Sequence, residues 1–366
     1  MHSVHLHYTL SHRNDAESHV SPEATLLSHP LMALLKAVAE QGSISAAARQ
    51  MDLSYRHVWG ELKRWEEVLG HELIIWEKGQ SARLTEFGDK LMWAERLTQA
   101  RLAPQLEALR ADLERTFAVA FDPDAHVLAL YASHDDALPR LREFAASTGL
   151  HLDMRFCGSV DAIRALNEGR CMVAGFHAPV EPDADSLVAR TYRPLLKRGQ
   201  HKLISFARRE QGWMTRPGNP LNLHAWQDMT RADVRIVNRA LGTGTRLLLD
   251  QWLQSQSVAS TAVRGYEHEE SSHAAVAACI AAGQADAGLG IASAALAQGL
   301  DFVPLTQENY WLVCLKSALD SPPIAQLREA LQSSAWQDKI NLLAGYTASP
   351  DCGRIQSLKL RLPWWN

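Results

Sequence analysis

Residues 30–84 contain a set of short helical segments, and these restrict the possible folds of the chain more than any other feature of the sequence. The first segment, 31–38, has apolar residues at helical spacing and is followed by a glycine stop. The second segment, 44–50, contains three consecutive alanines, which allow a neighbouring helix to approach closely. Ser43 and Ser54 precede the second and third segments, where a hydroxyl can cap the free backbone N–H groups of a helix start.

A short strand pair follows these helices. Residues 71–76 have the composition of a strand, residues 77–82 form a polar loop, and Arg83-Leu84 returns from that loop. Helix, short helix, turn, helix and hairpin is the order of elements in a winged helix-turn-helix. We therefore predict a DNA-binding domain over residues 30–84.

The third helical segment carries residue types that read DNA. A recognition helix enters the major groove by its N-terminal end, where side chains reach base edges. Residues 49–64 contain four cations and two anions, a local excess that the formal charge of −4 for the whole chain hides. Arg56 is the best candidate for a bidentate contact to guanine. Further candidates for contacts to bases or phosphates are Ser43, Ser54, Tyr55, His57, Trp59, Lys63 and Arg64, with Lys78 and Arg83 in the wing.

One long amphipathic helix is predicted after this domain, from residue 85 to about residue 117. Its apolar residues hold a largely three-four spacing, which is typical of a seam for a partner helix; they are Leu91, Leu102, Leu106, Leu109, Leu113 and Phe117. Pro104 interrupts the pattern, and we expect it to bend or break the helix. Segment 85–121 is therefore predicted to link the domains and to pair two copies into a homodimer, which can pair further into a tetramer.

Strands and helices alternate over residues 122–366, after a linker at Asp122-Pro123-Asp124. The predicted elements of the first set are strands 127–131, 151–156 and 171–176 with helices 138–146 and 159–167. Those of the second set are strands 234–237 and 285–291 with helices 245–253 and 273–282. This alternation of strands and helices favours a parallel, doubly wound sheet in two lobes with a cleft between them. The whole chain is thus predicted to be a multidomain α+β protein.

Small polar residues gather where the predicted strands end, which is where open α/β sheets bind ligands. Ser133 and His134 follow the first strand, and Ser159 follows the second after a glycine. His177, directly after the third strand, either faces the cleft or caps the strand. Arg239 follows a predicted strand of the second lobe, in the loop 238–244.

The part of this loop that follows Arg239 is the sharpest of these candidates. It reads Gly242-Thr243-Gly244-Thr245-Arg246 and opens a helix. Its two glycines let the backbone approach a ligand closely, and its two threonines offer hydroxyls. Arg239 or Arg246 would balance the charge of a bound anion.

Each of these features also has a purely structural interpretation. Tyr55 and Trp59 can be packing residues, with the nearby cations forming a solvated face. The long helix can pack on its own domain. Helix caps alone explain each polar strand end, whereas all of them together favour an anion site.

Several other functions are not supported by the sequence. Segment 1–29 carries six histidines but no apolar core of signal-peptide length, so we expect a disordered leader. The longest small-apolar run, 274–283, is about half of what a membrane span requires. Five cysteines without a CxxC pair argue against a disulfide scaffold or structural zinc and for a reducing cytoplasm.

Motifs of catalysis and of nucleotide binding are missing as well. We find no GxSxG, GxGxxG or GxxxxGK[ST], and we predict no enzyme. His268 and His273 lie five residues apart, roughly 140° around a helix, and cannot share a face. We therefore predict no metal site in this segment.

The chain resembles two known families in its motifs. Residues 31–92, with GSISAAARQMDLSYRHVW and ARLTEFG, resemble the winged helix-turn-helix of ModE-type molybdate-responsive regulators, which is related to the LysR type. Residues 127–315 resemble the periplasmic-binding-protein-like domain. The motifs that carry this second resemblance are ASHDDAL, VNRALGTGTRLLLD, GYEHEESSHAAVAACIAAGQADAGLGI and LDFVPLTQENY.

The resemblance implies a transcription regulator whose effector domain closes on a small ligand. Related binding proteins hold molybdate or tungstate with hydroxyls and with backbone N–H groups at helix starts. Carried over by motif, the implied oxyanion contacts are Ser133, Ser159, Thr243, Gly244, Thr245 and Arg246.

We therefore predict a cytoplasmic, homodimeric regulator that binds a double-stranded DNA operator and a small anionic effector. Molybdate or tungstate is the first expectation for the effector, with no covalent cofactor and no membrane partner. One alternative is a LysR-like regulator of a small carboxylate such as formate. A second alternative, which only the family neighbourhood supports, is an enzyme of molybdenum-cofactor metabolism.

Overall fold

A computed structural model describes residues 29–76, 81–121, 125–181 and 183–365. The chain divides into two compact units, 1–99 and 100–366. Three predictions lie outside the described residues: the leader up to residue 28, the wing contact of Lys78 and the linker 122–124. Within the described part, no helix is both long enough and apolar enough to cross a membrane.

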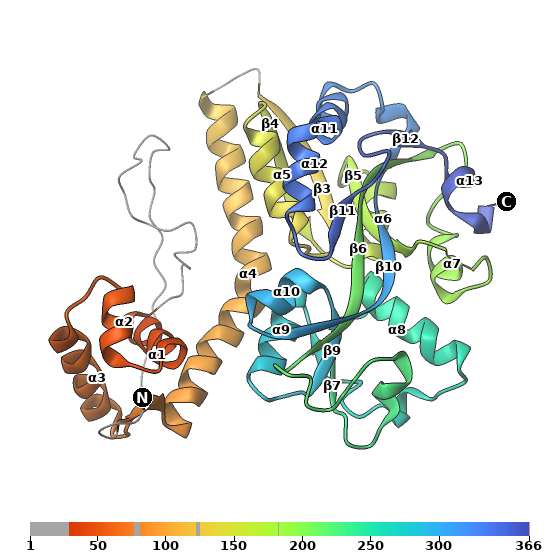
Figure 1. The fold of residues 1–366 in the computed structure, drawn as a ribbon. Coiled ribbons are helices and arrows are strands. Elements are labelled where there is room, and N and C mark those ends of the chain that lie inside the picture. Colours follow the sequence, from red (N-terminus) through yellow and green to blue (C-terminus); the bar gives the residue numbers. More distant parts are fainter. Residues whose placement is uncertain (1–28, 77–80, 122–124, 182, 366) are drawn as a thin grey trace. The chain divides into compact units, whose positions relative to one another are not determined.

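The first unit has the predicted order of elements. These are α1 (Pro30–Gln41), α2 (Ile44–Gln50), α3 (Tyr55–Leu69), β1 (Ile74–Ile75) and β2 (Arg83–Leu84) (Figure 1). The Oγ atoms of Ser43 and Ser54 accept hydrogen bonds from backbone N–H groups one turn on, as the capping pattern predicts. The core contains Leu35, Val38, Val58 and Leu62, all fully buried.

The first strand of the pair is shorter than expected, two residues instead of six. The backbone N–H groups of Leu73 and Ile74 donate to Glu66 Oε1, at 2.9 and 3.4 Å. Glu66 lies on α3 and is buried. The start of the predicted strand is therefore held by a helix side chain and by Thr85, directly after β2, whose N–H donates to the carbonyl of Leu73 at 3.0 Å.

The long helix α4 (Glu86–Phe121) continues through Pro104, so of the bend or break expected there the break does not occur. Proline lacks the N–H that would bond the carbonyl of Ala100, four residues earlier. That carbonyl instead accepts a hydrogen bond from Ser272 Oγ at 3.2 Å. A tertiary contact thus replaces the backbone hydrogen bond that Pro104 removes.

The second unit contains a ten-stranded sheet in the order β4-β3-β5-β10-β6-β9-β7-β8, with β11 and β12 also paired to β6. The strands are β3 (His126–Ala132), β4 (Leu150–Phe156), β5 (Val173–Pro179), β6 (His201–Thr215), β7 (Ile236–Arg239), β8 (Glu269–Glu270), β9 (Ala287–Gly290), β10 (Asp301–Leu315), β11 (Tyr346–Ala348) and β12 (Ile355–Gln356). The helices of this unit besides α4 are α5 (Ala137–Ala146), α6 (Ser159–Asn167), α7 (Leu187–Tyr192), α8 (Gly244–Ser255), α9 (His273–Ala281), α10 (Ala292–Ala297), α11 (Pro322–Gln332), α12 (Ser334–Asn341) and α13 (Leu358–Arg361).

The sheet is mixed and not purely parallel, which corrects the sequence-based expectation. β3 is parallel to β4 and β5, and β7 is parallel to β8 and β9. The two long strands β6 and β10 were not predicted, and they run antiparallel to each other and to their other neighbours. They run side by side through the middle of the unit (Figure 1).

Two separate cores confirm the two lobes. One core surrounds β3, β5, α6 and α7, and includes Ile163, Phe176 and Tyr192. The other surrounds β7, β9 and α8, and includes Trp213 and Ile236. β6 and β10 contribute residues to both cores, so they are the strands that cross between the lobes.

Candidate functional site

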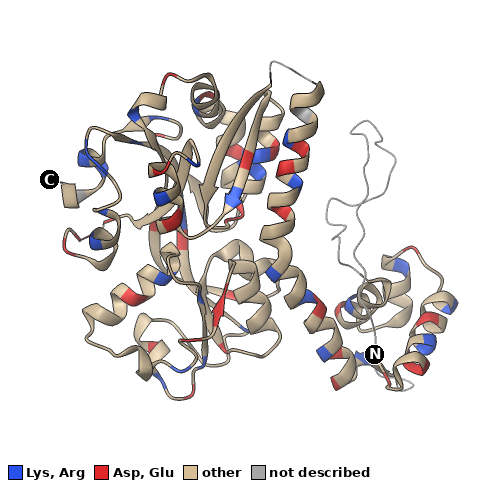
Figure 2. Cartoon of the chain, turned by 180° about the vertical axis from the view of Figure 1, so that it is seen from behind, with Lys and Arg blue, Asp and Glu red and all other residues tan. Residues whose placement is uncertain are grey.

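The N-terminal end of α3 is exposed, as a groove-reading helix requires. Ser54, Tyr55, Arg56 and His57 are all exposed, and no described residue forms an ion pair with Arg56. Lys63 and Arg64, one turn or more further on, pair with Glu66 and Glu61 of the same helix at 2.6 and 2.7 Å. Acidic and basic residues are accordingly interspersed along α3 (Figure 2). This leaves Arg56 as the uncompensated cation at the helix start.

Aromatic contacts surround the expected DNA-contact residues. Trp59 stacks on Tyr55 with ring centroids 6.3 Å apart and meets Trp76 edge-on at 5.9 Å. The Lys63 ammonium lies 5.0 Å from the Trp59 ring. Arg83 is exposed in β2. These side chains form one partly exposed surface, and their contacts to DNA stay predictions.

In the second unit, the buried arginines differ in how they are paired. Arg239, the last residue of β7, is 1% exposed. Its Nε and Nη1 atoms have no hydrogen-bond partner, and no carboxylate of the described residues pairs with it. Burial, followed by repulsion from Arg209, lowers the pKa of Arg239 to about 9. The guanidinium is therefore still charged at neutral pH, and the charges of Asp135 and Glu270, which lie beyond ion-pair distance, offset this only in part.

A cavity of about 520 Å³ reaches Arg239. Ser133 and His134 after β3, Gly158 after β4, and Thr243 after β7 line it together with Arg239. The ends of the predicted strands therefore line one cavity. This is expected, because the carboxyl ends of parallel strands lie at one edge of a sheet. The α4 residues on another wall are Arg101, Pro104, Gln105, Ala108, Leu109 and Asp112.

The starts of α6 and α8 approach each other beside this cavity. The backbone N–H of Val160 donates to the carbonyl of Gly242 at 3.4 Å. A Cβ on Gly158 would lie 2.9 Å from that same oxygen, so only glycine fits there. Ser159 is fully buried, and its hydroxyl lies at the Tyr192 hydroxyl, where a hydrogen bond with Ser159 opposes the larger rise that burial causes in the pKa of Tyr192.

The two threonines of the loop differ in what they can still donate. Thr243 Oγ1 donates to the carbonyl of Ala240 at 2.8 Å and accepts from the Arg246 N–H at 3.3 Å, as the N-cap of α8. Thr245 Oγ1 accepts from Gln211 Nε2 at 2.9 Å, and no described residue accepts its hydrogen. Thr245 therefore retains a free donor, whereas the donor of Thr243 is already engaged.

Arg246 does not lie with the other candidates for anion contact. Its guanidinium pairs with Asp250 at 3.2 Å and with Glu269, and it lies 4.2 Å from the Tyr266 ring. Two carboxylates already balance its charge. Of the two arginines that the sequence offered as the counter-charge, the structure leaves Arg239 available.

His177 and Gly244 are in contact, and both are buried. His177 lies within β5, which extends three residues beyond the predicted strand end. A Cβ on Gly244 would lie 3.1 Å from the Cβ of His177. His177 Nδ1 has no hydrogen-bond partner among the described residues, and burial lowers the pKa of this imidazole. His177 thus faces the lobe interface as a neutral ring.

Sequence reasoning missed a buried ion network next to these residues. Arg209 of β6 pairs with Asp135 and, at 3.1 Å, with Glu308 of β10. Tyr346 donates its hydroxyl hydrogen to Asp135 at 2.8 Å. Burial opposes ionisation of Asp135, but His177 and Arg209 outweigh it and hold its pKa below the usual value. Asp135 directly follows His134, so its position after β3 was the available signal.

Comparisons with known proteins assign a family to each part of the chain. Residues 141–332, more than half of the chain, match the family described as PBP superfamily domain. Residues 30–89 match the bacterial regulatory helix-turn-helix protein, lysR family. The expected pairing of these two domain types is confirmed.

Individual proteins also resemble the chain. The uncharacterized protein YvgK of Bacillus subtilis (strain 168) is 30% identical over 226 residues, which cover 62% of this chain and 72% of YvgK. The molybdenum-pterin-binding protein MopB of Rhodobacter capsulatus is 34% identical over 86 residues, 22% of this chain and 32% of MopB. Among solved structures, an OxyR mutant of Corynebacterium glutamicum has a TM-score of 0.42 at 18% identity, covering 86% of this chain and 93% of that one.

Proposed function

This chain belongs to the PBP superfamily and carries a LysR-type helix-turn-helix domain, and from that premise we propose that its effector is a small oxyanion. The two domains together make it a DNA-binding transcriptional regulator with an effector-binding domain. The proposal concerns which ligand that domain takes and which residues hold it.

The unpaired guanidinium of Arg239 is the observation that carries the proposal. A buried charge without a partner costs about 3–5 kcal/mol, so natural proteins seldom keep one without a use. An oxyanion at the inner end of the cavity would lie against the guanidinium of Arg239, which lines the cavity and whose buried Nε and Nη1 make no hydrogen bond within the described protein. The same anion would give the Arg239 charge its missing partner.

Hydroxyl donors just behind the cavity lining favour a tetrahedral oxyanion. Ser159 and Thr245 are buried at the starts of α6 and α8 and do not line the cavity themselves, but they lie one and two residues beyond the lining residues Gly158 and Thr243. The partial positive charge at both helix starts adds to the attraction. The likeness to MopB, a molybdenum-pterin-binding protein, supports molybdate as the first anion to test, with tungstate beside it.

The size of the cavity favours a second candidate, an organic carboxylate. A volume of about 520 Å³ falls within the range of roughly 300–1,000 Å³ typical of sites for small organic molecules. Met154, Phe156, Leu109 and Leu241 supply apolar lining. A carboxylate on Arg239 with an apolar body toward these residues would fill the cavity, whereas a tetrahedral anion occupies only its inner end.

We also infer that α4 pairs two copies of the chain. Leu109, Leu113 and Phe117 recur every four residues on α4 and are 56%, 42% and 42% exposed. Such large exposed apolar residues on one helix are typical of an interface. A dimer would place two α3 helices on one double-stranded operator, with Arg56 of each at a base edge.

Isothermal titration calorimetry on the full-length protein tests the effector. Molybdate, tungstate, sulfate and formate are titrated separately into wild type, Arg239→Gln and Arg155→Gln. Arg155 also lines the cavity but is exposed, so its replacement controls for a general loss of positive charge. We expect heat with molybdate or tungstate that only Arg239→Gln abolishes. Binding of formate alone would instead select the carboxylate, and no heat with any of the four would reject the small-anion class.

A further inference from the structure

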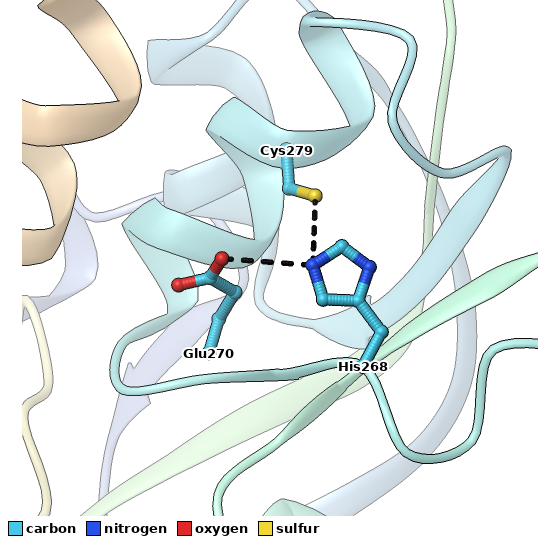
Figure 3. Close-up of side chains that lie close together, drawn as sticks. All are labelled: His268, Glu270 and Cys279. Atoms are coloured by element: carbon cyan, nitrogen blue, oxygen red, sulfur yellow. Dashed lines mark hydrogen bonds and ion pairs between the residues drawn. The ribbon is translucent and has the colours of Figure 1, made fainter. Parts of the chain in front are cut away.

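A second cluster of polar side chains lies outside the cavity at Arg239. His268 precedes β8, Glu270 is on β8, and Cys279 is on α9 (Figure 3). His268 Nε2 lies 3.7 Å from Cys279 Sγ and 3.8 Å from Glu270 Oε1. One nitrogen, one oxygen and one sulfur thus converge within 4.8 Å of one another.

We propose that these three side chains form a binding site for a divalent metal ion of the zinc class. In a tetrahedral zinc site, bonds of about 2.0–2.3 Å put neighbouring ligand atoms roughly 3.3–3.8 Å apart. Two of the three separations already lie in or at the edge of this range, so only small side-chain rotations would close the site. The sequence analysis predicted no metal site here because it considered only the pair His268 and His273. In the structure, Cys279 lies beside His268 instead.

The surroundings of the cluster provide both shielding and access. Cys279 and Glu270 are buried, whereas the His268 side chain is 34% exposed and opens the site to solvent. A water molecule could complete the fourth position from that side, as in other zinc sites with three protein ligands. Imidazole, carboxylate and thiolate are all donors that zinc accepts.

Binding requires the thiolate form of Cys279. The metal would form a bond to Sγ while the thiol proton leaves to solvent, and no electron is transferred. Burial, with the nearby negative charge of Glu270, raises the pKa of this thiol to about 11. The thiol is therefore protonated at neutral pH until a metal displaces its proton, and about one proton is released for each ion bound.

Arg101 of α4 competes with a metal for the same carboxylate. Its Nη2 lies 2.6 Å from Glu270 Oε1, and its Nε lies 3.1 Å from both carboxylate oxygens. The Arg101 side chain is 49% exposed, so it can move into solvent when a dication takes Oε1. Metal binding would thereby loosen the tie between α4 and β8 within this unit.

Cobalt(II) titration of the reduced, full-length protein tests the site. We expect a thiolate-to-cobalt absorption band in the near ultraviolet that zinc abolishes by displacement. The histidines of segment 1–29 cannot produce such a band, because it requires a sulfur ligand. Its absence in wild type, or its persistence in Cys279→Ser, would overturn the proposal.

Three further variants test the ligand His268, the competitor Arg101 and a thiol outside the cluster. His268→Gln, at a partly exposed position, should weaken cobalt binding at least tenfold while leaving the thermal unfolding of the metal-free protein unchanged. Arg101→Gln should strengthen binding at least threefold because it removes the competitor, and weaker binding would contradict the competition. Cys157→Ser, a half-buried thiol in the other lobe, should keep the full band. None of these measurements depends on an anion at Arg239.

Discussion

Arg209 and Arg239 are two buried arginines of the same unit with opposite surroundings. Both are at most 2% exposed. Arg209 pairs with Asp135 and Glu308, on β6 where the two crossing strands meet. No carboxylate of the described residues lies within ion-pair distance of Arg239, which ends its strand at a cavity. The contrast indicates that the first arginine serves the fold, whereas the second is available to a ligand.

The threonines of the loop and its arginine, Arg246, also differ in whether their donors are already bonded to the protein. Thr243 and Arg246 direct their donors to the protein itself, to Ala240 and to two carboxylates respectively. Thr245 keeps a hydroxyl hydrogen that no described residue accepts. We therefore propose to tell structural residues from ligand contacts by whether a donor is already satisfied, and not by its position in the loop.

Replacement of the paired arginine should have the largest effect. Arg209→Gln leaves Asp135 and Glu308 buried without their cation, and we expect a loss of about 3–5 kcal/mol in the free energy of unfolding. Urea unfolding followed by tryptophan fluorescence measures this loss. Arg231→Gln, which breaks an exposed pair with Asp233, should change it by less than about 1 kcal/mol. An Arg209 variant as stable as wild type would show that the ion pairs of Arg209 do not stabilise the fold, and would contradict the difference drawn between the two arginines.

The unpaired arginine should respond in the opposite way. Arg239→Gln removes a buried charge that lacks a partner, so we expect the free energy of unfolding to rise, by about 1–4 kcal/mol. Effector affinity should fall about a hundredfold, because each charge-assisted hydrogen bond contributes roughly 1.5–3 kcal/mol. A ligand present at a hundred times its Kd should stabilise wild type by about 2.7 kcal/mol and this variant hardly at all. Thermal unfolding with and without ligand measures both effects.

Local patterns in the sequence were sufficient to predict much of this arrangement. Cap residues such as Ser54 and Thr243 act through neighbours three residues away, so their role can be read along the chain. The rule that parallel strands end at one edge was sufficient to bring Ser133 and Arg239 to one cavity. The pairing of Arg246 was also readable, because Asp250 stands four residues later on the same helix.

Contacts between distant segments could not be predicted in this way. The strand β6 contains Arg208, Arg209 and Glu210, a run that looks like an exposed loop. Arg209 can be buried because Glu308 of β10, 99 residues later in the sequence, pairs with it. Cys279 likewise reaches His268 only through the fold of α9 onto β8. No local spacing carries such information.

The two threonines offer a sharper test of engaged and available donors. Thr245→Val should weaken oxyanion binding about tenfold, because one hydrogen bond to a charged ligand contributes roughly 1.5 kcal/mol. Thr243→Val should leave affinity within about twofold and instead cost about 1 kcal/mol of stability through the lost N-cap. Calorimetry and urea unfolding on both variants check this. The reverse assignment would show that Thr243 contacts the anion.

The pH dependence of stability provides the smallest and most specific test. Burial, followed by the charges of Arg239 and Arg209, lowers the pKa of His273 well below its usual value. As the pH falls below about 6.5, His273 becomes protonated in the unfolded state but stays neutral in the folded state. The free energy of unfolding therefore decreases by up to about 1.4 kcal/mol per pH unit for this group. His273→Gln should flatten this decrease between about pH 6.5 and about pH 5, whereas the exposed His224→Gln should not. Arg239→Gln should flatten it in part, because a neutral neighbour no longer opposes protonation of His273. A slope identical to wild type in Arg239→Gln would mean that Arg239 does not carry an uncompensated charge beside His273, and the contrast with Arg209 would then be lost.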